Sequence, residues 1–94
     1  MKELLSDEMV DASLVERALA WERDGRELVK RVRRDRFAGA LAYVNQVGAL
    51  AESADHHPDI EIRWDTVILR LSTHSAGGLT GMDLDLAEAI DRLG

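Results

Sequence analysis

Apolar and polar residues largely alternate along Ile60 to Ser72, with one interruption near Asp65-Thr66. Successive side chains of a strand point to opposite faces, so a period of two predicts strands here. The interruption carries residue types that are typical of a turn. We therefore expect two strands that form a hairpin, each with one apolar face that another layer of the fold has to cover.

An earlier hairpin is predicted at Asp24-Gly25, a dipeptide that favours the tight turn between two antiparallel strands. Trp21 and Glu22 lead into this turn, and Glu27 to Arg34 is expected to form the second strand. These first two strands are expected to pair. Four strands in a short chain leave exposed edges, which favour pairing between subunits, so we expect a homodimer or a homotetramer.

Helical spacing of apolar residues marks three further segments. The first begins at the N-cap Ser6 and is expected to last about three turns. The second begins at Asp35, is the longest, and ends before His56-His57-Pro58, because a residue that precedes proline is disfavoured in a helix. The third begins at Thr80, with Asp83 at its third position. Their apolar residues are Met9, Val10, Leu14, Val15, Ala18 and Leu19 in the first, Phe37, Ala40, Leu41, Val44, Val47, Leu50 and Ala51 in the second, and Leu86, Ala87, Ile90 and Leu93 in the third.

The predicted order is helix, two strands, helix, two strands, helix, in one domain that spans residues 1–94. Short hairpins separated by helices are typical of an α+β fold. We expect a four-stranded antiparallel sheet that is covered on one face by three helices, because an antiparallel sheet can leave its other face in water.

Composition and charge exclude several classes of function. A formal net charge of −6 opposes binding to nucleic acid, and the five basic residues between Lys30 and Arg36 are expected to divide between the two faces of a strand. Without cysteine the chain has no disulfide, no thiolate metal site and no cysteine nucleophile. No apolar run reaches the length of a membrane span, and the segment that follows Met1 lacks the apolar stretch of a signal peptide. We expect a soluble cytoplasmic protein that binds neither nucleic acid nor membranes.

All three histidines, His56, His57 and His74, fall between the end of the second helix and the end of the fourth strand. The start of one strand lies beside the end of the next in an antiparallel hairpin, so these histidines are expected to meet at one end of the sheet. Imidazole acts as acid or base near neutral pH, and Glu52 and Asp55 are placed to orient an imidazole. The cluster therefore indicates a site of proton transfer.

Seven residues resemble, at fixed spacing, the pattern of the pterin-4a-carbinolamine dehydratase family: Glu52, His56, His57, Pro58, Trp64, His74 and Asp83. The segments Leu71 to His74 and Gly78 to Thr80 are also similar to those of that family. One departure is that Gly81-Met82 precede Asp83, where some members carry a basic residue. The predicted order of helices and strands covers the chain as the fold of this family requires.

The resemblance implies that the chain removes water from 4a-hydroxytetrahydropterin, which aromatic amino-acid hydroxylases release, and so forms quinonoid dihydropterin in tetrahydropterin recycling. It implies no metal and no organic cofactor. It places His56 and His74 as the acid/base pair and His57 as a contact to the substrate. The other substrate-binding candidates are Glu52, Asp55, Trp64, Ser72, Thr73 and Asp83. Trp64 is equally compatible with core packing, and Asp83 with a purely structural place in the first turn of a helix.

Two other functions use the same residues. Three histidines with Glu52 or Asp55 are enough ligands for zinc, but adjacent histidines seldom converge on one ion. The resembled family also includes a member that acts as a dimerisation cofactor, so a non-catalytic binding module on the same fold is the main alternative. Three titratable groups at one end of a sheet favour the enzyme.

Overall fold

The computed structural model describes residues 3–94; Met1 and Lys2, at the N-terminal segment considered above, lie outside the described residues. Three helices and four strands follow the predicted order, with a short 3-10 helix added before the last helix. They are α1 (Asp7–Glu16), β1 (Glu22–Asp24), β2 (Glu27–Arg33), α2 (Phe37–Ala54), β3 (Asp59–Arg63), β4 (Thr66–Leu71), η1 (His74–Ala76) and α3 (Gly81–Asp91). None of the helices within residues 3–94 is long and apolar enough to cross a membrane.

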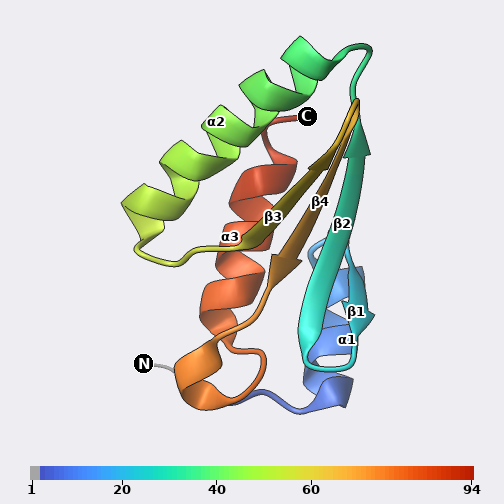
Figure 1. Ribbon diagram of the computed structural model, residues 1–94. Coiled ribbons are helices and arrows are strands. Elements are labelled where there is room, and N and C mark those ends of the chain that lie inside the picture. Colours follow the sequence, from blue (N-terminus) through green and yellow to red (C-terminus); the bar gives the residue numbers. More distant parts are fainter. Residues whose placement is uncertain (1–2) are drawn as a thin grey trace.

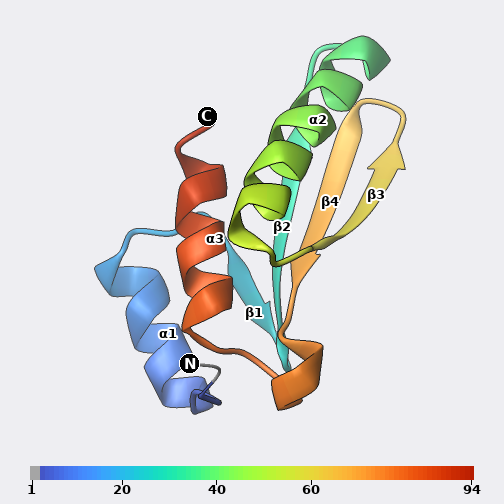
Figure 2. The ribbon, with the colours of Figure 1, turned by 90° about the vertical axis from the view of Figure 1, so that its left-hand side faces the viewer.

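The four strands form one antiparallel sheet in the order β1-β2-β4-β3. Figures 1 and 2 show α1, α2 and α3 on one side of this sheet, which confirms the predicted α+β architecture. Leu28 at the start of β2 pairs with Leu71 at the end of β4, and Asp59 at the start of β3 pairs with Arg70. One end of the sheet therefore collects the β1-β2 turn, the α2-β3 loop and the segment that leaves β4.

Both hairpins form, and each turns through a residue of positive φ. Gly25 has φ +62°, a conformation that glycine adopts without steric cost. The second turn lies at Trp64-Asp65, one residue earlier than expected, and Trp64 has φ +54°. The side chain of Trp64 is 71% exposed, so its interpretation as core packing is wrong. Burial raises the pKa of the Asp65 carboxyl, but hydrogen bonds from Thr66 and Arg33 outweigh this effect and lower the pKa below its ordinary value.

The core lies between the sheet and the helices. Its largest fully buried apolar side chains are Tyr43, Leu28, Leu69, Leu71, Ile90, Val10, Val47 and Val67. Helix α2 buries Ala40, Tyr43, Val47 and Ala51, a stripe that leaves Phe37 and Leu41 exposed, in contrast to the broader predicted face. Within residues 3–94 the buried Tyr43 hydroxyl has no hydrogen-bond partner, and the Arg34 guanidinium lies 4.5 Å from the centre of the Tyr43 ring. Desolvation raises the pKa of Tyr43.

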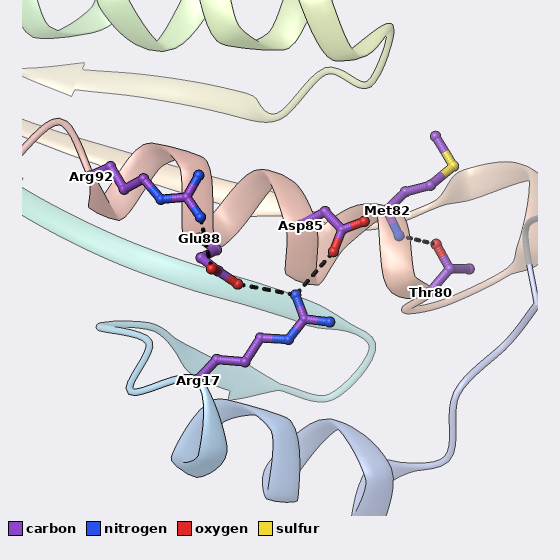
Figure 3. Close-up of polar contacts among 6 residues, drawn as sticks. All are labelled: Arg17, Thr80, Met82, Asp85, Glu88 and Arg92. Carbon is purple, nitrogen blue, oxygen red and sulfur yellow. Dashed lines mark hydrogen bonds and ion pairs between the residues drawn. The ribbon is translucent and has the colours of Figure 1, made fainter.

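Polar contacts attach α1 and β2 to α3. Figure 3 shows Arg17, at the end of α1, reaching Asp85 at 2.9 Å and Glu88 at 3.3 Å on α3. The Lys30 ammonium pairs with Asp91 on the helix-covered side of β2, whereas Arg31 is exposed on the other face. The predicted division of the basic cluster is thus confirmed.

The helix caps follow the sequence in two of three cases. Ser6 accepts a hydrogen bond from the Met9 amide at the start of α1. Thr80 accepts one from the Met82 amide, drawn in Figure 3, and forms a capping box with Asp83 at the start of α3. The N-cap of α2 is Arg36, which makes no side-chain capping bond, so the expected cap at Asp35 is wrong by one residue.

Candidate functional site

Two adjoining clefts lie at the end of the sheet where β2 begins and β4 ends. The larger cleft, of about 300 Å³, is lined by Arg26, Glu27, His57, Asp59, Arg70, Ser72, His74 and Gly77. The smaller cleft, of about 270 Å³, is lined by Asp55, His56, His57, Ser72, Thr73, His74, Ser75 and Met82. Three residues, His57, Ser72 and His74, line both. The structure therefore brings all three histidines to the border of one continuous region.

His56 is the buried histidine of the three, with 9% of its surface exposed. Helix α2 ends at Ala54, and Asp55 adopts the left-handed conformation, with φ 50° and ψ 43°, that turns the chain away from the helix axis. The His56 amide still bonds the Ala51 carbonyl at 3.1 Å, which fixes the backbone at this point. Its Nε2 lies 2.6 Å from Oδ1 of Asp83, a residue that is fully buried.

Asp83 holds three groups at once. Its Oδ2 accepts hydrogen bonds from the Thr73 hydroxyl at 2.8 Å and from the Thr80 amide at 2.9 Å, while Oδ1 faces His56. The hydroxyls of Thr73 and Thr80 lie 2.8 Å apart. Because Asp83 is 0% exposed and lines neither cleft, we correct its predicted role: it orients His56 and caps α3 instead of contacting a ligand. The Thr73 hydroxyl is likewise directed into this network.

His57 forms a second pair with a carboxylate, on the exposed side of the region. Its Nε2 lies 2.6 Å from Oε2 of Glu52, which stands in the last turn of α2. Both side chains are more than half exposed. Since His57 lines both clefts, the pair places a carboxylate-bound imidazole at the border that the two clefts share.

His74 approaches from the opposite segment of chain. It is the first residue of η1 and is exposed. Gly77, with φ +77°, returns the chain so that the Thr73 amide bonds the Gly78 carbonyl at 2.8 Å. The Ser72 hydroxyl lies 3.5 Å from the same carbonyl and borders both clefts. This short loop therefore presents His74 and Ser72 to both clefts.

Trp64 is not brought to the histidines. It stands in the β3-β4 turn, whereas His57 lies just before the start of β3, so the whole strand separates them. Trp64 lines neither cleft, so its predicted contact with the substrate is not compatible with this arrangement.

Asp55, in contrast, lines the smaller cleft and is exposed.

Four charged residues of the larger cleft were missed by sequence reasoning: Arg26, Glu27, Asp59 and Arg70. The register explains their presence, because Asp59 pairs with Arg70 and the β1-β2 turn lies at the same end of the sheet. To find these four residues from the sequence one needs the order of the strands in the sheet, which single motifs do not provide. Among residues 3–94, no three His, Asp or Glu side chains are grouped so that they could hold a metal ion.

Comparisons with known proteins find one family over almost the whole chain. The family model for pterin 4 alpha carbinolamine dehydratase matches residues 3–93. A protein of Nocardia farcinica, named "Putative pterin-4-alpha-carbinolamine dehydratase", is 53% identical over 97% of this chain and 95% of its own length, and a protein of the same name from Roseiflexus castenholzii is 48% identical over 99% of each chain.

Solved structures resemble the fold. A protein from Brucella melitensis, described as a transcriptional coactivator/pterin dehydratase, superposes with a TM-score of 0.86 at 29% identity and covers 97% of this chain and 98% of its own. A pterin dehydratase-like protein, described as a RuBisCO assembly factor in the alpha-carboxysome, superposes with a TM-score of 0.63 at 22% identity, over 80% of this chain and 87% of its own, which shows a shared fold alone. With a family model that matches almost its whole length and relatives near half identity, this chain belongs to the pterin-4-alpha-carbinolamine dehydratase family.

Proposed function

We propose that this protein catalyses the dehydration of 4a-hydroxytetrahydropterin to quinonoid dihydropterin, as a cytoplasmic enzyme of tetrahydropterin recycling that needs no metal or organic cofactor. An aromatic amino-acid hydroxylase is the class of enzyme that would supply its substrate. The observation that carries the proposal is the gathering of three imidazoles, two of them bonded to carboxylates, around one cleft region of a size that suits a flat bicyclic ring.

The reaction moves two protons and no electrons. One proton is delivered to the 4a hydroxyl, which leaves as water while the N5 lone pair forms the C4a–N5 double bond. A second proton is then lost from N5, so the catalyst is returned unchanged. Two imidazoles on different segments of chain are suited to these two transfers, because an imidazole is readily both acid and base near neutral pH.

We assign these transfers to His56 and His74. His56 is oriented by Asp83, and an ionised carboxylate can only accept, so Nε2 carries its hydrogen and Nδ1 remains for proton exchange. His74 lines both clefts from the opposite segment of chain. His57, held by Glu52, is assigned to substrate contact together with Ser72 and Asp55.

The test is to generate 4a-hydroxytetrahydropterin and follow its decay by ultraviolet absorbance in the presence of the protein. We expect a decay rate that rises in proportion to protein concentration above the spontaneous rate. A rate equal to that in buffer, from protein that is folded by circular dichroism, would reject the enzyme.

A non-catalytic binding module is the second candidate. The Brucella melitensis relative is described as a transcriptional coactivator as well as a dehydratase, and the structural neighbour of the alpha-carboxysome is described as an assembly factor. Pterin binding without turnover in the same assay would favour this candidate.

A further inference from the structure

Arg26 is brought to the larger cleft by the tip of the first hairpin. Gly25 and Arg26 form the two-residue loop between the paired residues Asp24 and Glu27. The Arg26 Nη1 donates to the Gly77 carbonyl at 3.4 Å, which attaches the hairpin to the segment after η1. Figure 2 shows the turn between β1 and β2 beside η1. Arg26 thus joins His57 and His74 in the lining of one cleft although it lies far from them in sequence.

The Arg26 guanidinium keeps donors for a ligand. Arg70, the other cation of the cleft, lies 3.7 Å from both Asp24 and Glu27. Within residues 3–94 no carboxylate forms an ion pair with Arg26, whose one hydrogen bond is the long contact to Gly77. A guanidinium carries five N–H donors, so most of those of Arg26 face solvent or the cleft.

Arg26 also stands at the border of a further cavity, distinct from the two clefts of the histidines. This cavity, of about 530 Å³, lies between the N-terminal segment and the loop after η1, and Leu4, Leu5, Val10 and Leu79 contribute to its lining. Arg26 and Gly77 line both this cavity and the cleft of the histidines. A ligand bound between His57 and His74 that extends past Arg26 would therefore enter it.

The covalent structure of a pterin determines which part of the bound ligand would extend past Arg26. The reacting atoms C4a and N5 must lie beside the histidines, and C6, which carries the substituent of natural pterins, is bonded directly to N5. We propose, on the basis of the function proposed above, that Arg26 binds oxygen atoms of the C6 substituent and so determines which pterins the cleft accepts. Hydroxyl groups accept hydrogen bonds from the guanidinium, and a phosphate or carboxylate would pair with it more tightly.

The test compares two substrates that differ at C6 alone: the 4a-hydroxy forms of a tetrahydropterin with a dihydroxypropyl group and of one with a methyl group. For Arg26→Ala we expect KM for the dihydroxypropyl substrate to rise about tenfold with kcat nearly unchanged, because the lost contact is a hydrogen bond to a charged donor made equally in ground and transition states. KM for the methyl substrate should not change. Arg26→Lys should recover part of the loss, and it provides the same comparison if the alanine variant does not fold. The matched control is Arg31→Ala, because Arg31 is exposed and lines neither the larger cleft nor the cavity of about 530 Å³.

An equal rise of KM for both substrates, or no rise for either, would overturn the role of Arg26 while the dehydratase stands. If the wild-type protein turns over neither substrate, the proposed function fails, and the dissociation constants of 7,8-dihydropterins with the same two substituents decide the inference. Weaker binding of the dihydroxypropyl compound alone by Arg26→Ala would support it. Equal binding by variant and wild type, or no binding by either, would overturn it.

Discussion

Replacement of Asp83 by asparagine keeps the size of this buried side chain and removes its negative charge. The carboxylate accepts from Thr73 and Thr80 through one oxygen and faces His56 Nε2 with the other. An amide has only one acceptor oxygen, and the backbone N–H of Thr80 cannot change its role. The amide oxygen must therefore face Thr80, and the NH₂ group then meets the N–H of His56.

Burial sets the free-energy cost of this contact between two hydrogen-bond donors. Asp83 is 0% exposed and His56 is 9% exposed, so water cannot replace the lost bond, and a buried donor without its charged partner costs about 2–3 kcal/mol. For a domain of this size that corresponds to a fall in Tm of about 10–20 °C. His56 can escape the conflict only by moving its hydrogen to Nδ1, which reverses the proton arrangement that we assign to catalysis. Dehydration should therefore slow by up to about 10²-fold, the effect expected for loss of His56 itself.

Thermal unfolding followed by circular dichroism measures the first effect, and the dehydration rate well below the Tm of the variant measures the second. The control is Asp85→Asn, two residues further along α3, where the exposed pair with Arg17 is worth about 0–1 kcal/mol. If Asp83→Asn matched this control in both Tm and rate, the reasoning about a shared buried network would be refuted.

Three further outcomes are expected. Treatment with a chelator should leave the dehydration rate unchanged, and a loss of activity that zinc restores would contradict the proposed proton-transfer chemistry. Tyr43→Phe should be as stable as the wild type or slightly more stable in urea unfolding, because it removes a buried hydroxyl that finds no partner among the described residues 3–94. A loss of stability above about 1 kcal/mol would show that the hydroxyl does make a bond. Light scattering should show a dimer or tetramer at micromolar concentration, since β1 and β3 are open edges and Phe37, Leu41 and Trp64 are exposed, whereas a monomer would mean that these surfaces are not interfaces.

The fold was largely predictable because local signals and the sheet agree. The Asp24-Gly25 dipeptide, one residue before the observed loop at Gly25-Arg26, and the alternation along Ile60 to Ser72 each specify a hairpin. Thr80 with Asp83 specifies the start of α3. The face of α2 that packs against the sheet was less predictable. Its sequence is apolar on several sides, so only packing against the sheet decides that Tyr43 is buried while Phe37 is exposed.

The gathering of the three histidines at one end of the sheet was predictable, and the charged residues of the larger cleft were not. His56, His57 and His74 lie near one another because the α2-β3 loop and the end of β4 share one end of the sheet, which antiparallel pairing requires. Motif spacing does not reveal whether a residue touches a ligand. Asp83 is buried behind His56, and Trp64 stands at the far turn. Arg26 carries no motif and enters the cleft only through the position of β2 beside β4.

The most direct test of the central claim, histidine proton transfer in this cleft, is a cycle of alanine variants at His56 and His74. We expect each single variant to slow dehydration by about 10²-fold while the protein remains folded, and the double variant to be slower than either. We expect His57→Ala to raise KM more than it lowers kcat. If the His56 and His74 variants kept near-wild-type turnover with intact circular dichroism spectra, the histidines would be structural and the binding module would replace the enzyme as the account of this protein.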